Sequence, residues 1–408
     1  MRLGRLMAGI GLLLIAGCGT TVERTPAPFD QIETVAPYGL RLADDEVRFW
    51  GDRVSREDIE LIIAQTVQDY AQLLGDRQAG DAPLTETALA LSGGGPDGAF
   101  GAGLLKGLAE RGERPDYTVV TGVSTGAIIA LFAFLGPEYD GMLEEIYTSY
   151  STDDLVEDTI FSGLTGGPAL SDVSGYRALI ERYIDDMVVA AIADRYRSGK
   201  TLLIGSTNLD AVRPVIWNVG AIAASGHPDA RRLIHDIVQA SSAIPGAFPP
   251  VLIPVETEDG RRFDEMHVDG GATQQVLLFS PSFSIQAVDE RSGLDIERTV
   301  YVVLNNKIQK SYSPVDADLF SIAGTAVSSL LVGSGSGDVY RFFAIAQRDG
   351  IDLQITSIPQ DFDSEPEEPF DPTYMRALYD LGYETGRKGV DWSAYPPDFV
   401  PWPSPTPG

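Results

Sequence analysis

Cysteine and histidine are scarce in this 408-residue sequence, which contains one cysteine and three histidines. A single cysteine, Cys18, cannot form an intramolecular disulfide, and it excludes zinc and iron–sulfur sites built from several cysteines. Three histidines also argue against a metal held in a cage of histidine ligands. The sequence therefore gives no reason to expect a metal site.

Basic residues are scarce as well. The chain has 30 lysines and arginines against 59 acidic residues, which gives a formal net charge of −29. So acidic a surface repels the phosphate backbone, and we expect no nucleic-acid partner. It also opposes electrostatic docking on anionic lipid. With 44% hydrophobic and 22% charged residues, the composition is that of an ordinary globular protein.

The N-terminus lacks an apolar run long enough to span a bilayer. Residues 6–16 are apolar and follow Arg2 and Arg5, but a membrane helix needs about 20 residues. The run is typical of a signal peptide. It ends in Ile15-Ala16-Gly17-Cys18, which resembles the bacterial lipobox, and we expect Cys18 to carry a diacylglyceryl group. The alternative is a secretory signal that happens to be followed by a cysteine.

The middle of the chain alternates between strand-like and helix-like apolar spacing. Residues 87–92 predict a strand that runs into a glycine-rich loop and then a helix ending near Gly112. Residues 117–121 predict a second strand, followed by an apolar helix at residues 127–135. Further strands are expected at residues 201–206, 214–219 and 299–304, and helices at residues 58–74 and 229–242. This alternation predicts an α/β fold.

A G-x-S-x-G pattern, Gly122-Val-Ser124-Thr-Gly126, lies between the second strand and the apolar helix. A serine on such a strand-to-helix turn presents its hydroxyl at a helix N-terminus, which is the arrangement of a nucleophile elbow. The flanking glycines leave room for the strand and the helix to pack. Ser124 is therefore a candidate nucleophile; alternatively, its side chain caps the helix.

The loop after the first strand contains Gly93, Gly94, Gly95 and Gly98. Consecutive glycines let backbone N–H groups face a cavity without side-chain cover, where they can stabilise an oxyanion or bind a phosphate. The loop also fits the G-x-G-x-x-G pattern of dinucleotide-binding folds. That alternative requires an acidic residue at the end of the second strand, where the sequence has Thr121 and Gly122.

Asp269 ends another expected strand and is followed by Gly270 and Gly271. This pattern is typical of an active-site turn and equally of a plain Asx turn. No histidine follows position 267, which argues against a serine–acid–histidine order with a late histidine. His267 would share a strand face with Asp269 and is either a supporting partner of the site or a structural residue.

Together, these patterns resemble the patatin-like phospholipase family. The resemblance covers residues 87–281 and includes a fourth element, Ala240-Ser-Ser-Ala-Ile-Pro-Gly-Ala-Phe-Pro-Pro250. It implies a three-layer α/β/α fold with a mostly parallel central sheet. It also implies a catalytic dyad, with Ser124 as the nucleophile and Asp269 as its base. The N–H groups of the oxyanion hole would come from Gly93, Gly94 and Gly95.

The sequence departs from the family pattern at Asp97, where many members have arginine or lysine. A basic side chain beside the oxyanion loop is therefore missing, and we expect neutral or zwitterionic esters to be better substrates than anionic ones. A carboxylate that pointed inward would oppose the charge of the oxyanion. We therefore expect Asp97 to point outward and to cap the helix that begins near Gly98.

The resemblance implies a lipid acyl hydrolase that cleaves carboxylic esters of lipids or phospholipids through an acyl-enzyme, without a cofactor. Burial of Asp269 would raise its pKa and improve its match to a serine hydroxyl. Alternatives are a carboxylesterase or an acyltransferase with the same dyad, and a non-catalytic lipid-binding envelope lipoprotein. Headgroup, acyl position, chain length, membrane leaflet and oligomeric state are not determined by the sequence.

These interpretations divide the chain into six parts. They are a signal peptide (1–17), a tether and lead-in (18–57), an N-terminal helix and linker (58–85), the catalytic domain (86–285), a C-terminal part of the fold with an acidic loop (286–395) and a proline-rich tail (396–408). The signal peptide and Cys18 predict a lipid-anchored protein of the bacterial cell envelope that acts on membrane lipid.

Overall fold

The computed structural model describes residues 24–43, 46–53, 60, 84–158, 171–277, 283–292, 296–307 and 314–399. The predicted signal peptide, Cys18 and all but one residue of the predicted helix at 58–74 lie outside these ranges. Among the described helices, none has the length and apolar character needed to cross a membrane.

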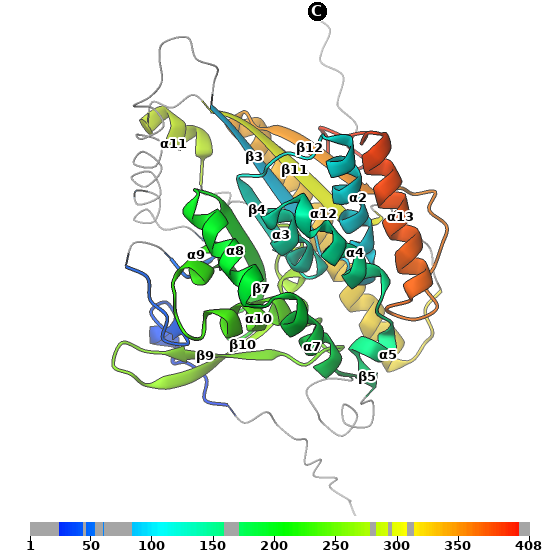
Figure 1. The fold of residues 1–408 in the computed structure, drawn as a ribbon. Coiled ribbons are helices and arrows are strands. Elements are labelled where there is room, and N and C mark those ends of the chain that lie inside the picture. The colour runs from blue at the N-terminus through cyan, green and yellow to red at the C-terminus, as the bar shows by residue number, and fades with distance from the viewer. Residues whose placement is uncertain are drawn as a thin grey trace, which may run out of the picture.

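A ten-stranded sheet runs through the described part of the molecule (Figure 1). Its strands are β1 (Ala36–Pro37), β2 (Arg48–Trp50), β3 (Leu84–Leu91), β4 (Val119–Val123), β7 (Thr201–Asn208), β8 (Arg213–Asn218), β9 (Val251–Glu256), β10 (Arg262–Asp269), β11 (Ile296–Lys307) and β12 (Asp352–Ile358). The strands β7, β4, β3, β11 and β12 lie side by side and parallel. Antiparallel strands extend the sheet beyond β7. A further pair, β5 (Glu157–Asp158) and β6 (Ser171–Asp172), is separate.

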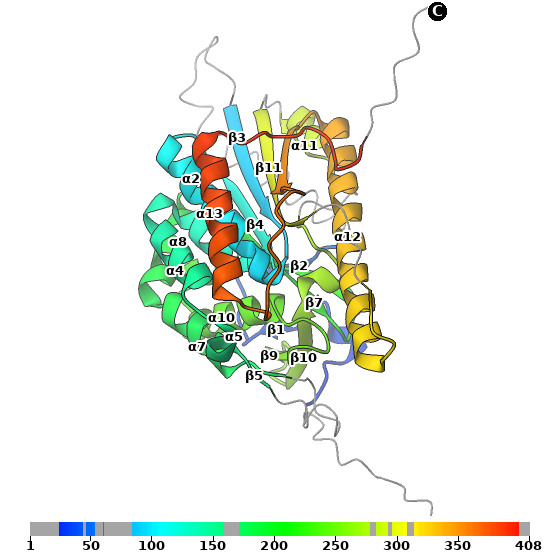
Figure 2. The ribbon, with the colours of Figure 1, turned by 90° about the vertical axis from the view of Figure 1, so that its right-hand side faces the viewer.

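Helices cover both faces of the parallel strands, which confirms the expected three-layer α/β class (Figure 2). One face carries α2 (Gly98–Arg111), α3 (Thr125–Leu135), α4 (Asp140–Thr148) and α13 (Pro372–Lys388), and the other carries α11 (Ile285–Ser292) and α12 (Leu319–Asp349). The remaining helices are α5 (Thr152–Leu155), α7 (Ser174–Tyr183), α8 (Asp186–Arg197), α9 (Val219–Ala224) and α10 (Ala230–Ser241). Short 3-10 turns are η1 (Phe29–Gln31), η2 (Gly95–Asp97), η3 (Pro137–Tyr139) and η4 (Gly270–Ala272).

Buried apolar side chains form a cluster on each face of the sheet. The larger cluster joins α2, α3 and α13 to the strands. The second joins α12, through Val339, Phe342 and Ala346, to β11 and β12. Burial of these apolar faces accounts for the attachment of both helical layers. The apolar character of residues 127–135 is explained in the same way, because every residue of α3 is buried.

Helices α2 and α13 cross at backbone contact through two pairs of glycines. A Cβ on Gly103 would lie 2.0 Å from the carbonyl oxygen of Tyr379, and one on Gly382 would lie 2.1 Å from a carbonyl oxygen of α2. Gly107 and Gly386 repeat this contact one turn further along. No larger residue fits at these positions without moving the helices apart.

Part of the predicted tether packs against the sheet. Strand β1 pairs with β9, and β2 pairs with β8. Arg24 forms an ion pair with Asp210 at 2.6 Å, and Arg48 forms a buried two-pronged ion pair with Glu265 of β10. Residues 24–37, which lie within the predicted tether and lead-in, are therefore attached to the sheet, and β1 supplies a partner for the edge of β9.

Candidate active site

Ser124 lies at the turn between β4 and α3, as the G-x-S-x-G pattern predicts. Its φ of 56° lies in the left-handed region, which is strained for a residue with a side chain. The flanking glycines permit the turn, because a Cβ on Gly122 would lie 2.2 Å from the Gly126 carbonyl oxygen, and one on Gly126 would lie 2.4 Å from that of Leu91. The Ser124 side chain makes no capping hydrogen bond to α3, so helix capping does not explain this serine.

The register of β7 brings Ser124 and Asp269 together. Strand β8 occupies one edge of β7. On the other edge, β4 pairs with β7 as far as Val123, which lies opposite Gly205. Strand β10 takes over at the next residue, with Asp269 opposite Ser206. The ends of β4 and β10 therefore meet, which places the Ser124 side chain near enough to the Asp269 carboxylate to lower its pKa.

Asp269 is buried, with 2% of its surface exposed. Burial raises the pKa of Asp269 to about 6, while the neighbouring Ser124 side chain and the hydrogen bond from the Gly271 N–H act in the opposite direction. The Gly271 N–H donates to Oδ1 of Asp269 at 2.7 Å. A carboxylate with this pKa is ionised at neutral pH but is more basic than an exposed aspartate, which suits it to accept a proton from a hydroxyl group.

The stretch at residues 240–250 holds both residues in place. The Ser124 N–H donates to Oγ of Ser241 at 2.9 Å, and this hydroxyl donates to the Gly205 carbonyl at 2.6 Å. The Asp269 N–H donates to the carbonyl of Ala243 at 2.9 Å. This segment therefore fixes the strained turn and the end of β10 relative to each other.

The glycine-rich loop lies against Ser124. A Cβ on Gly93 would lie 3.1 Å from the Ser124 Cβ. The Gly93 N–H donates to the Gln275 carbonyl at 3.2 Å, which removes it from the three expected oxyanion donors. Within the described residues, the N–H groups of Gly94 and Gly95 have no acceptor, and Gly95 has open space on its Cβ side. Gly94 and Gly95 remain the candidate donors.

The comparison with protein families agrees with this geometry. Residues 89–279 match the patatin-like phospholipase family. The resemblance noted in the motifs is thereby confirmed for this segment, which contains the glycine-rich loop, Ser124 and Asp269. No curated relative matches the sequence.

Solved structures give weaker likenesses to this chain. VipD from Legionella pneumophila aligns with a TM-score of 0.35 and 13% identity over 75% of this chain and 67% of its own. Human GIVD cytosolic phospholipase A2 aligns with a TM-score of 0.30 and 12% identity over 80% of this chain and 56% of its own. A chain of the SpcU–ExoU complex from the Pseudomonas aeruginosa type III secretion system aligns with a TM-score of 0.29 and 14% identity. The alignment covers 76% of this chain and 53% of the other. This chain spans little more than half the length of the latter two, and at these scores the likenesses carry no argument about activity.

Asp97, where the patatin-like domain departs from the family pattern, does not cap α2. It stands at the N-cap position, but its side chain makes no capping hydrogen bond. Instead, its Oδ1 accepts a hydrogen bond from the Tyr374 hydroxyl at 2.7 Å. Burial raises the pKa of Asp97 to about 6, while Tyr374 and Lys307 lower it. The expectation of an outward-pointing cap is wrong because α13, which begins near Tyr374, packs over the loop and supplies a donor.

His267 belongs to a buried network beside the candidate active site. Its Nδ1 lies 3.0 Å from Oγ of Ser206, and its Nε2 lies 3.2 Å from the Glu265 carboxylate. Glu265 is in turn paired with Arg48 of the lead-in. Burial lowers the pKa of His267, which favours a neutral ring. Of the two interpretations of His267, the structural one agrees with these contacts.

Three residues that the sequence did not indicate support the site, two through their side chains and one through its backbone. Asp338 of α12 accepts hydrogen bonds from the N–H groups of Gln275 at 2.7 Å and Val276 at 3.2 Å. Gln275 in turn accepts from Gly93, so α12 is linked to the glycine-rich loop. The Tyr176 hydroxyl donates to Oγ of Ser242 at 2.8 Å, next to the segment that holds Asp269. The only sequence signal for these contacts was the position of Asp338, a single charge directly after the uncharged residues 319–337.

The described residues contain no group of three or more His, Cys, Asp or Glu side chains that could hold a metal ion. The groups that meet at the site are a serine hydroxyl, an aspartate carboxylate and backbone N–H groups. Such a set can carry out nucleophilic attack, proton transfer and stabilisation of an oxyanion.

Proposed function

We propose that this protein hydrolyses carboxylic esters of lipids, with Ser124 as the nucleophile and Asp269 as the base. The observation that carries the proposal is that Ser124, on a turn with strained backbone, meets the buried Asp269 carboxylate where β4 and β10 end beside each other on β7. The match of residues 89–279 to patatin-like phospholipases supports a lipid ester as the substrate.

In the first half of the proposed reaction, Oγ of Ser124 attacks the carbonyl carbon of the ester. The hydroxyl proton passes to the Asp269 carboxylate as the new C–O bond forms. The N–H groups of Gly94 and Gly95 stabilise the negative charge on the carbonyl oxygen. Asp269 then gives the proton to the departing alcohol, and the acyl group remains on Ser124 as an ester.

In the second half, water attacks the acyl-enzyme and gives its proton to Asp269. Collapse of the tetrahedral intermediate releases the carboxylic acid, and Ser124 recovers its proton from Asp269. An alcohol in place of water would lead to acyl transfer by the same steps. Product analysis therefore separates a hydrolase from an acyltransferase.

We also propose that Cys18 carries a diacylglyceryl group that anchors the enzyme to a membrane of the bacterial cell envelope. Support comes from the short apolar run at residues 6–16 and the lipobox-like sequence before Cys18. Two acyl chains suffice for stable anchoring. Such an anchor would keep the active site close to membrane lipids, and the tether between them is at most a short segment, because the chain is packed on the sheet from residue 24.

The dyad is tested with the variants Ser124→Ala and Asp269→Asn. Each should abolish ester hydrolysis in a folded protein, and the double variant should be no worse than either single variant, because the two groups act as a unit. Substantial turnover by folded Asp269→Asn would contradict its assignment as the base.

Covalent labelling separates an enzyme from a lipid-binding protein. A fluorophosphonate should label the wild-type protein and the control Ser198→Ala, which removes an exposed serine, but not Ser124→Ala. Absence of labelling in the wild-type protein would favour the non-catalytic alternative. Comparison of phospholipids with short-chain esters then distinguishes a lipid acyl hydrolase from a carboxylesterase.

A further inference from the structure

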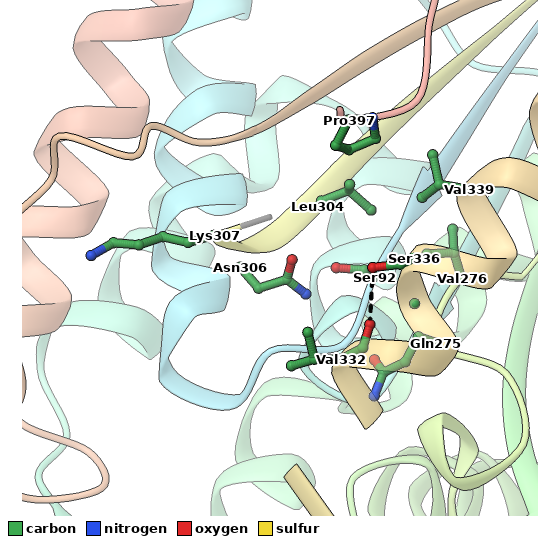
Figure 3. Close-up of a pocket in the computed structure, with 11 residues that line it drawn as sticks. Ser92, Gln275, Val276, Leu304, Asn306, Lys307, Val332, Ser336, Val339 and Pro397 are labelled. Carbon is green, nitrogen blue, oxygen red and sulfur yellow. Dashed lines mark hydrogen bonds between the residues drawn. The ribbon is translucent and has the colours of Figure 1, made fainter. Parts of the chain in front are cut away.

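The cleft beside the glycine-rich loop is too small for a lipid chain. It lies between α12 and the end of β11, with Ser92 at one end and Leu304 and Val332 on its walls (Figure 3). Its enclosed space has room for about one water molecule. This cleft therefore cannot receive a lipid, and the outer surface near the active site is the part of the described molecule that can meet one.

The hairpin loop between β7 and β8 carries two exposed apolar side chains. Leu209 is 41% exposed and Val212 is 77% exposed. Val212 also has a φ of 56°, which is strained for a β-branched residue. Hairpin loops normally place glycine, asparagine or aspartate in left-handed conformations. An exposed and strained valine does not stabilise this loop, so folding alone does not account for it.

The charged residues at this loop are held in ion pairs. Asp210, within the loop, pairs with Arg24 of the N-terminal segment at 2.6 Å. Arg213, the first residue of β8, pairs with Glu33 at 2.9 Å and with Asp52 at 2.8 Å. The loop therefore presents apolar side chains to solvent without an unpaired charge of its own.

The N-terminal segment adds a third apolar side chain to this region. Phe29 is 90% exposed. It lies between Arg24 and Glu33, the two residues whose ion pairs fasten the segment to the hairpin loop. Together with Leu209 and Val212, Phe29 forms an exposed apolar surface, the tip patch.

The tip patch lies at the active-site end of the sheet. Asp269 is opposite Ser206 of β7, and β7 ends two residues later at Asn208. A strand rises about 3.3 Å per residue, so Leu209 lies about 10 Å beyond the level of Asp269 along β7. A surface that meets the tip patch is therefore close to Ser124.

The length of the N-terminal chain indicates what covers the tip patch. Six positions separate Cys18 from Arg24, and Arg24 is fixed to Asp210. Six residues of fully extended chain span at most about 20 Å. If Cys18 carries its proposed diacylglyceryl group, the bilayer lies within about 20 Å of the hairpin loop.

The local charge favours a zwitterionic bilayer over an anionic one. Asp30, next to Phe29, is acidic and exposed, and the whole chain carries −29. Anionic headgroups would be repelled, whereas zwitterionic headgroups have no net charge.

We propose that the tip patch enters the interface of a zwitterionic bilayer and turns the Ser124 end of the sheet toward it. The inference rests on the proposed lipid hydrolase function and lipid anchor, and it adds the surface that orients the enzyme. Three side chains give a reversible contact, whereas the two acyl chains on Cys18 supply the lasting attachment.

A fluorophore at the hairpin loop tests the contact directly. In a Cys18→Ser background, Val212→Cys provides the only thiol in the chain, since the sequence has one cysteine. This thiol can be labelled with an environment-sensitive nitrobenzoxadiazole group. The matched control is Met187→Cys in the same background, because Met187 of α8 is 76% exposed and lies outside the tip patch.

Phosphatidylcholine vesicles should shift the emission of the label at position 212 to shorter wavelength and leave that at position 187 unchanged. Folded, fully labelled protein that shows no shift at position 212, or equal shifts at both positions, would overturn the proposal. Phosphatidylglycerol vesicles should give a smaller shift at position 212. A larger shift with phosphatidylglycerol would contradict the choice of a zwitterionic surface.

Substitutions in the tip patch test its consequence for catalysis. The readout is the ratio of the rate on phosphatidylcholine vesicles to the rate on soluble p-nitrophenyl acetate. The triple variant Phe29→Ser, Leu209→Ser, Val212→Ser should lower this ratio at least about tenfold, because it removes the apolar area that the bilayer would cover. Met187→Ser should leave the ratio unchanged. An unchanged ratio in the folded triple variant would show that the tip patch does not orient the enzyme.

Val212→Gly separates lipid contact from folding. Glycine adopts a φ of 56° without strain, so the variant should keep wild-type stability in urea unfolding and still lower the ratio. If the parent enzyme hydrolyses neither substrate, the proposed function has failed, and the emission shift still tests the tip patch. If vesicles cause no shift but the triple variant changes the mass in sedimentation velocity, the tip patch joins two copies of the chain and the proposal is wrong.

Discussion

Mild acid should inactivate this enzyme while it is still folded. Asp269 must be ionised to accept the proton of Ser124, and burial raises the pKa of Asp269 to about 6. At about pH 5, roughly one molecule in ten would retain the carboxylate, so kcat/KM should fall about tenfold from its value at about pH 8. An aspartate with the ordinary pKa of 3.8 would lose less than about 10% of its activity at the same pH.

The experiment needs a control for Asp97, because burial raises its pKa to about 6 as well. Asp97→Asn removes this titration and keeps an oxygen for the hydrogen bond from Tyr374. The acidic limb of the kcat/KM profile, measured with a soluble short-chain ester, should persist in Asp97→Asn. A flat profile in folded wild-type enzyme would refute the role of Asp269. If the acidic limb disappears in Asp97→Asn, the limb reports the titration of Asp97 and not that of Asp269.

The same pKa makes a prediction about stability. Because the pKa of Asp269 is higher in the folded than in the unfolded protein, folding takes up a proton between pH 3.8 and about 6. The contribution of Asp269 to the free energy of unfolding should therefore fall as the pH rises through this window, by on the order of 3 kcal/mol. Asp269→Asn cannot ionise, so urea unfolding should show an inactive variant that is more stable than the wild type at pH 8. Equal stability at pH 8 would contradict a buried, ionised carboxylate.

Substitutions at three further positions test the anchor and the supports of the site. Cys18→Ser should release active enzyme from the membrane fraction, and retention after high-salt and carbonate washes would argue against lipidation. Ser241→Ala leaves the buried N–H of Ser124 without its acceptor, so it should lower the free energy of unfolding in urea by about 1–3 kcal/mol. It should also lower kcat with little change in KM. An unchanged kcat would mean that the turn at Ser124 keeps its conformation without Ser241. Asp338→Ala removes the acceptor of two buried N–H groups, at about 1–3 kcal/mol each, whereas Asp338→Asn keeps an oxygen and should cost less. Equal losses in the two variants would show that the charge of Asp338, and not its hydrogen bonds, matters.

The parts of the site that could be predicted are those encoded by local sequence. The apolar runs before Gly93 and Ser124 specify strands β3 and β4, and the glycines at the ends of these runs specify the turns. Both features act within a few residues, so pattern and spacing suffice. The position of Asp269 at a strand end was predictable for the same reason, but its meeting with Ser124 depends on the register of β10 against β7.

The parts that could not be predicted depend on segments far away in the chain. Asp97 was expected to cap a helix, but a tyrosine from α13 offers its carboxylate a hydrogen bond instead. The Gly93 N–H was expected to face the oxyanion, but the carbonyl of Gln275 accepts it. In both cases a local preference was overridden by a tertiary contact, which no spacing rule describes. The packing of residues 24–37 on the sheet was missed in the same way, since it depends on which strand edges are open.

The glycine contacts between α2 and α13 make the glycine-rich loop depend on a segment far away in the sequence. Helix α2 starts at the glycine-rich loop, and its close partner ends at residue 388, near the end of the chain. Strand β3, which leads into the same loop, likewise pairs with β11, more than 200 residues later. Contacts so distant in sequence form late in folding. A chain in which α13 has not yet packed on α2 would therefore lack a support of the glycine-rich loop, even with Ser124 and Asp269 already in place.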